Sequence, residues 1–238
     1  MENHMTSTWT SLNIEAERVE ITTNQQATEI CSLLKNATST LADGFTEAEI
    51  KGSKAAYAQQ GLYSQNMNTL KCSVDLAMRG YYTQSTGLLR GVYENWIAFH
   101  YLAAHPIKAE FWLNKDLRPP NHSEMLKALG PDFVERKADA HGWYGALCRF
   151  AHTDALVVLP HLGSYQGEQI AFFGGKYKPD LFRTCAYTIS LFTSIMLREI
   201  SKMISSNSEW QQRFMINLES LLQFIENENI EFKKGWSS

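Results

Sequence analysis

The chain has 238 residues, of which 44% are hydrophobic and 20% are charged, and its net charge is −3. This composition excludes an intrinsically disordered chain, because it supplies enough apolar surface for a sizeable core. It also excludes the strong overall basic charge that draws a protein to nucleic acid or to anionic membranes, although a local basic patch stays open.

Four cysteines lie far apart, and none belongs to a CxxC pair: Cys31, Cys72, Cys148 and Cys185. This spacing argues against a thiol redox motif and a zinc knuckle. The first twenty residues lack the basic start and apolar run of a secretory signal. No apolar stretch reaches the ~18 residues that span a membrane, because Arg90 and Glu94 interrupt the longest one. We therefore expect a soluble, cytoplasmic protein with reduced thiols and no membrane partner.

The chain begins with a polar segment, residues 1–23, that is rich in Thr, Ser and Glu. We expect this segment to form a loosely held N-terminal arm. A single helical domain is expected over residues 24–232, because no linker-like stretch divides it.

Apolar residues recur at steps of three and four along most of this domain, which is the spacing of one helix face. Helix ends are expected at Gly44 and at His105-Pro106, and the capping box Thr46-x-x-Glu49 predicts a helix start. The predicted helices cover residues 25–41, 47–79, 81–104, 107–117, 123–129, 132–152, 180–203 and 208–230.

The segment 154–178 differs from the rest of the chain. Several glycines and Pro160 interrupt it, and residues 156–159 and 170–173 are of strand-forming type. These features predict a small irregular or β-hairpin insertion near 155–175. The expected fold is therefore all-α, a multi-helix bundle with this one insertion.

The predicted helix 81–104 is apolar on most faces but carries Arg90 and Glu94 in its middle. Residues four apart lie one turn apart on a helix, so these side chains can form an ion pair. A buried charge is costly unless it is paired in this way. Gly87 and Gly91 leave room for another backbone or a ligand beside Arg90. The pair is either a structural link, buried or half-buried, or part of a functional site.

A second candidate residue lies at the end of the predicted helix 132–152. His152 follows Arg149 and precedes Asp154. The helix dipole favours a protonated imidazole at this position, and Asp154 could orient the ring. The alternative is a capping histidine that bonds the last carbonyl groups of the helix.

Two patterns resemble those of uncharacterised bacterial helical proteins: GLLRGVYENWIAFHYLAAHP, an LLRxxxE helix with a His-Pro stop, and GALCRFAHTD, an aromatic-x-His turn. These proteins in turn resemble the HEPN superfamily of helical domains, often found as toxin or antiviral defence ribonucleases. The similarity covers roughly residues 65–155. HEPN ribonucleases carry an Arg followed by a His after four to six residues, a spacing that Arg136 and His141 match.

This resemblance implies a metal-independent ribonuclease without a cofactor. His141 or His152 would act as general acid and base, and an arginine would stabilise charge on the scissile phosphate. The 2′-hydroxyl group of the RNA would be the nucleophile. The candidate catalytic residues are Arg90, Glu94, Arg136, His141 and His152.

Two other functions stay open. The first is a non-catalytic interaction or scaffold module, in which Arg90–Glu94 locks the bundle and Arg90→Ala costs several kcal/mol. The second is a small-molecule-binding bundle with Arg90 as an anion clamp, in which aromatic residues line the pocket: Tyr93, Trp96, Trp143 and Tyr144.

Other chemistry finds little support in the sequence. It contains no HExxH, ExxH, GxSxG or phosphate-binding loop, although a scattered metal-ligand set of Glu94, His100 and His152 stays open. The apolar stripe Trp210–Ile225 is a candidate surface for a protein partner, and core packing is its more frequent use. We expect a homo-oligomer, with a dimer as the default.

Overall fold

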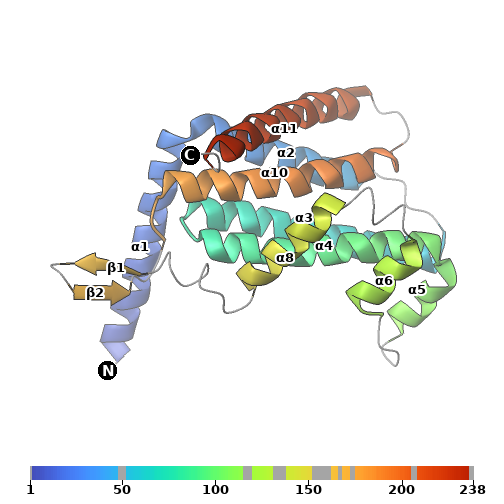
Figure 1. The fold of residues 1–238 in the computed structure, drawn as a ribbon, viewed down its shortest axis with the longest axis horizontal. Helices are drawn as coiled ribbons and strands as arrows, with labels where there is room; N and C mark the ends of the chain where they lie inside the picture. The colour runs from blue at the N-terminus through green and yellow to red at the C-terminus, as the bar shows by residue number, and fades with distance from the viewer. Residues whose placement is uncertain are drawn as a thin grey trace.

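The computed structural model shows an all-α helical bundle, which confirms the fold class expected from the sequence (Figure 1). The described residues are 2–47, 52–114, 120–130, 138–151, 162–165, 168–171, 175–204 and 208–235. Within them, no helix is both long enough and apolar enough to cross a membrane.

Long helices form the body of the molecule, and shorter ones cover part of its surface (Figure 1). In chain order the elements are α1 (Glu2–Gln26), α2 (Thr28–Glu47), α3 (Lys54–Met78), α4 (Tyr82–Ala104), α5 (Pro106–Leu113), α6 (His122–Leu129), α8 (Ala138–Ala151), β1 (Leu162–Tyr165), β2 (Glu168–Ala171), α10 (Pro179–Ser201) and α11 (Ser208–Gly235). Helix α4 packs between α3 and α10, and α6 and α8 cover its remaining side. It is therefore the central helix, with four apolar side chains that are 0% exposed: Leu89, Val92, Ile97 and Leu102.

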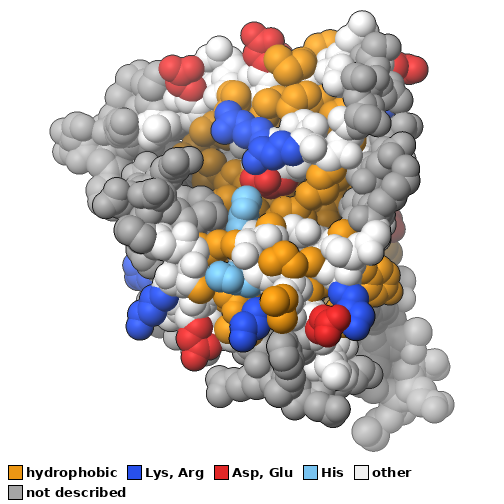
Figure 2. All heavy atoms as spheres, turned by 90° about the vertical axis from the view of Figure 1, so that its right-hand side faces the viewer, with side chains coloured by type: hydrophobic (Ala, Val, Ile, Leu, Met, Phe, Trp, Pro, Cys, Tyr) orange, Lys and Arg blue, Asp and Glu red, His pale blue; other side chains and the backbone are white. Residues whose placement is uncertain are grey.

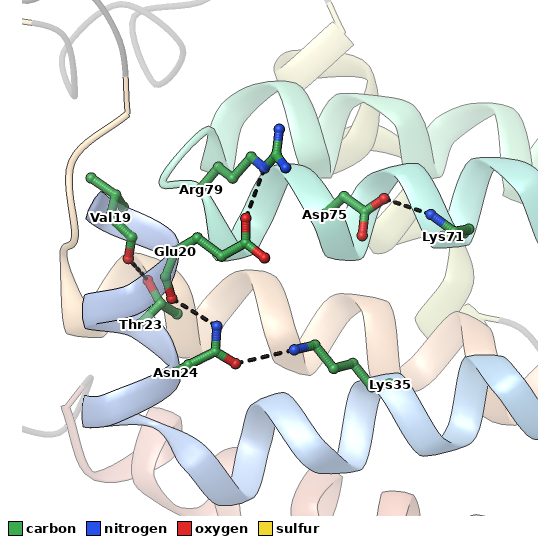
Figure 3. Close-up of polar contacts among 8 residues, drawn as sticks. All are labelled: Val19, Glu20, Thr23, Asn24, Lys35, Lys71, Asp75 and Arg79. Carbon is green, nitrogen blue, oxygen red and sulfur yellow. Dashed lines mark hydrogen bonds and ion pairs between the residues drawn. The ribbon is translucent and has the colours of Figure 1, made fainter. Parts of the chain in front are cut away.

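The polar segment 1–23 is helical rather than a loose arm, because it forms most of α1. Val19 and Thr23 are buried against the bundle. Glu20 pairs with Arg79 of α3 at 3.0 Å, and Asn24 accepts a hydrogen bond from Lys35 of α2 (Figure 3). Few apolar residues of this segment meet the bundle, since Ala16 and Val19 are buried whereas Ile14 and Ile21 are exposed, so composition alone does not predict the contact.

The helix end predicted at Gly44 is wrong, because α2 continues to Glu47. A Cβ atom on Gly44 would lie 2.6 Å from Trp210 Cζ2, so the missing side chain makes room for that indole. Trp210 is 1% exposed, and its Nε1 donates to the carbonyl oxygen of Thr40 at 3.0 Å. The α11 stripe is thus largely core: Phe214 is buried and stacks on Trp210, and Leu221 is buried about three turns beyond Trp210.

Helix α3 starts later than predicted, at Lys54, where the Ser53 hydroxyl accepts a hydrogen bond from the Ala56 N–H group. Of the predicted capping box, Thr46 belongs to α2 and Glu49 lies outside the described residues. The stop before Pro106 is confirmed: α4 ends at Ala104, and Pro106 begins α5. Proline is accepted there because the first residues of a helix have no intrahelical acceptor for their N–H groups.

Within the segment 155–175, strands β1 and β2 pair in antiparallel register. Leu162 lies opposite Ala171, and Tyr165 lies opposite Glu168. The predicted strand run 156–159 lies outside the described residues, and only the first half of the run 170–173 is described, as part of β2.

Candidate functional site

Arg90 and Glu94 form the ion pair that their spacing predicts. Arg90 Nε donates to Glu94 Oε1 at 2.9 Å, and the side chains are 27% and 36% exposed. The neighbouring Leu89 and Val92 are fully buried, so the pair lies at the edge of the core. It is half-buried, which leaves the guanidinium group partly accessible to solvent.

Tyr144 of α8 completes this contact. Its hydroxyl group donates to Glu94 Oε1 at 3.0 Å, and Arg90 Cζ lies 5.8 Å from the centre of its ring, within cation–π range. Burial, followed by the hydrogen bond with Glu94, raises the pKa of Tyr144 to about 12. The hydroxyl therefore stays protonated at neutral pH. Glu94 and Tyr144 together hold Arg90 in one orientation.

His122, the first residue of α6, joins the cluster through its ring. It stacks on Tyr144 with ring centres 4.1 Å apart and planes inclined by 13°. Tyr93 lies 5.4 Å from His122 and 5.3 Å from Tyr144. Sequence reasoning missed His122, because the local signal there, the capping box of Asn121 and Glu124, predicts a helix start and nothing about a site.

Two of the four aromatic residues predicted to line a ligand pocket belong to the core, and the side chain of a third, Trp143, is not described. Tyr93 is 3% exposed and Trp96 is 6% exposed. The Tyr93 ring packs between Trp96 and Phe192 of α10, at centroid distances of 6.1 and 6.4 Å. Tyr144, the fourth, is half-buried, as are Arg90, Glu94 and His122.

Helix α8 ends against α4, close to the Arg90 pair. A Cβ atom on Gly87 would lie 3.2 Å from the carbonyl oxygen of Phe150 and 3.9 Å from Ala151 Cα. Gly87 therefore allows the close approach of backbones that the sequence suggested. Gly87 and Arg90 are three residues apart, which places them on neighbouring turns of the same face.

The side chains of three predicted catalytic residues lie outside the described part of the structure. Arg136 and His152 lie outside the described residues. His141 belongs to the first turn of α8, but its side chain is not among those described. Their convergence with Arg90 stays a prediction.

A second polar cluster links α4 to α10 at the end of the bundle. His100 Nε2 lies 3.3 Å from Glu199 Oε1, and Lys202 donates to Glu199 Oε2 at 3.0 Å. Burial raises the pKa of Glu199, but the hydrogen bonds from His100 and Lys202 outweigh it and lower the pKa to about 2. On this end of the molecule, basic, acidic and histidine side chains lie together, bordered by hydrophobic ones (Figure 2). These contacts join α4 to α10. The described residues include no group of three or more His, Cys, Asp or Glu suited to a metal ion.

No protein-family model, curated protein or solved structure matches this chain. The resemblance to the HEPN superfamily therefore rests on the two sequence patterns of α4 and α8. It stays a prediction.

Replacing Arg90 by Ala is expected to lower the free energy of unfolding by about 1 kcal/mol, since partly exposed ion pairs are weak. The exposure of both side chains is the reason that this value is smaller than the several kcal/mol expected for a buried pair. Thermal unfolding measures the effect. Lys71→Ala is the matched control, because Lys71 also pairs four residues along a helix, but at 72% exposure. Equal losses in the two variants would show that the Arg90 pair stabilises the bundle no more than an exposed pair does.

Proposed function

We propose that this chain is a HEPN-like protein of the defence or toxin type, and that it cleaves RNA without a metal ion. The supporting observation is the orientation of Arg90 by Glu94 and Tyr144, with the guanidinium group still partly exposed. An arginine held in this way suits binding of a phosphate group, because its orientation need not be gained during the reaction.

The proposed roles follow from this arrangement. Arg90 stabilises the charge that develops on the scissile phosphate, and Glu94 positions Arg90. His152 follows directly after Ala151, the residue at which α8 ends beside Gly87. His152 is therefore our first candidate for general acid and base, and His141, paired with Arg136 in sequence, is the second.

Incubation of an unpaired, mixed-sequence RNA with the protein in excess EDTA tests this proposal. We expect cleavage by the wild type and a loss of at least about 100-fold in His152→Ala or in His141→Ala, the usual contribution of a general acid or base. His4→Ala is the matched control and is expected to cleave like the wild type. Cleavage that survives both substitutions, or no cleavage by the wild type, would count against a metal-independent ribonuclease.

A specific observation favours a second candidate, the non-catalytic interaction module. Glu94 balances the charge of Arg90, and the Tyr144 hydroxyl joins α8 to α4, so this cluster also suits a purely structural clasp. For either function we propose a cytoplasmic homodimer, whose mass light scattering would measure. An inactive wild type with an intact, partner-binding dimer would favour the module.

A further inference from the structure

The outward face of α3 carries a cavity that the Arg90 cluster does not use. Its volume is about 560 Å³, and residues of α2, α4 and α5 complete its walls. A second cavity of about 400 Å³ continues it along α3, since Gly61, Ser64 and Gln65 line both. The first volume lies within the range of small-molecule sites.

The lining of the first cavity combines aromatic rings with side-chain amides. Tyr57 is 69% exposed, so its ring is accessible to a ligand, and Trp112 also lines the cavity. Gln60, Gln65 and Asn95 supply amide groups. None of the lining residues that the structure describes is charged.

Asn95 is held in place from below. Its Nδ2 donates to Asn66 Oδ1 at 2.9 Å, and the buried Asn66 donates in turn to the carbonyl oxygen of Val92. This chain of hydrogen bonds fixes the Asn95 amide and leaves its carbonyl oxygen able to accept a hydrogen bond.

Gly61 lines both cavities. Glycine is unfavourable in a helix interior, and at Gly61 no neighbouring atom requires it, because a Cβ atom would meet nothing within 4 Å. Gly44 and Gly87 differ, since a Cβ atom there would meet Trp210 and Phe150. At Gly61, as at Gly91 and Gly145, the space beside the helix is open, and in the cavity a larger side chain at position 61 would fill it.

We propose that this cavity binds an unpaired nucleobase, stacked on Tyr57 and hydrogen-bonded through its edge to the amides. Aromatic rings stack on unpaired bases, and Asn and Gln amides recognise base edges. The uncharged lining suits a neutral heterocycle rather than a phosphate group. The inference rests on the proposed function for RNA as the source of the base, and a free nucleoside offers the same chemistry.

Fluorescence anisotropy with a labelled, unpaired 2′-O-methyl RNA dodecamer tests whether the cavity binds a base of RNA. This probe lacks the nucleophilic hydroxyl group, so binding is measured apart from cleavage. We expect Tyr57→Ala to raise the Kd about tenfold, the scale of one lost stacking contact. Gly61→Leu, which fills the space, is expected to do the same. Ile107→Ala is the matched control, because Ile107 is 77% exposed on α5 and lies outside the lining, and its Kd should stay within about twofold of the wild type.

Saturation-transfer NMR with adenosine, guanosine, cytidine and uridine tests whether the cavity binds free nucleosides. We expect signals with the wild type that disappear in Tyr57→Ala and in Gly61→Leu, while both variants keep the wild-type circular dichroism spectrum. Dodecamer binding that is the same in Tyr57→Ala and Gly61→Leu as in the wild type would overturn the proposal, as would a wild type that binds neither probe. If the wild type binds the probe through Tyr57 but cleaves no RNA, the proposed ribonuclease activity is wrong and the proposed nucleobase site is supported.

Discussion

Replacing Arg183 by Met is expected to lower the melting temperature by about 6–12 °C, which corresponds to about 3 kcal/mol in a chain of this length. Arg183 Nε and Nη2 donate to Glu228 Oε2 and Oε1 at 3.2 and 2.5 Å, and they join α10 to α11. The Glu228 side chain is only 6% exposed, so loss of Arg183 would leave a buried carboxylate without this partner. Because Arg183 itself is 51% exposed, we expect the lower end of the range for buried pairs.

Two further variants separate the stranded charge from other effects. Arg213→Met removes an arginine from the exposed pair with Asp43, whose side chains are 48% and 43% exposed, and is expected to cost less than about 1 kcal/mol. The double variant Arg183→Met/Glu228→Met should recover most of the lost stability, since apolar residues can replace a buried pair. Equal melting temperatures for Arg183→Met and Arg213→Met would show that Glu228 is not dependent on its partner.

The substitution Gly175→Ala is expected to cost about 3 kcal/mol, the upper end of the range for overpacking. Its Cβ atom would lie 1.7 Å from the carbonyl oxygen of Arg79, at the turn between α3 and α4. A backbone atom cannot turn away as a flexible side chain can, so the turn and the segment before α10 would have to separate. Gly80 meets the same segment, since its Cβ atom would lie 2.5 Å from the backbone nitrogen of Lys176.

The matched control is Gly145→Ala in α8, where a Cβ atom meets nothing within 4 Å. We expect this change to be neutral or stabilising, because Ala favours helix more than Gly does. Hydrogen exchange gives a second measure, since the Lys178 N–H group donates to the Tyr82 hydroxyl at 3.1 Å next to the contact. Protection of that N–H group in Gly175→Ala at the wild-type level would contradict the close packing of the two segments.

Interactions within one helix could be read from the sequence. The steps of three and four residues predicted the helices, and His105-Pro106 predicted the end of α4. The Arg90–Glu94 pair was predictable for the same reason, since residues four apart meet whatever surrounds the helix. The degree of exposure of that pair was not predictable, because it depends on α8.

Contacts between helices could not be predicted from the sequence. The sequence predicted a helix end at Gly44, because glycine often takes the left-handed conformation after a last helical turn. In the structure Gly44 lies within α2, where its missing side chain makes room for Trp210 of α11. The hydrogen bond of that indole to Thr40 spans 170 residues. His122 has no local pattern that marks it, and its stacking on Tyr144 depends on how α6 and α8 lie on α4.

The sequence by itself determined the all-α class, the position of most helices and the Arg90–Glu94 pair, because each depends on the period of one helix. Only the tertiary structure decided which side chains surround that pair, that Tyr93 and Trp96 belong to the core, and that α3 carries an open cavity at Gly61 whose described lining is uncharged. The physical reason is that a helix has several faces of similar composition. The packing of neighbouring helices determines which faces are buried, and this cannot be predicted from the spacing of residues within a single helix.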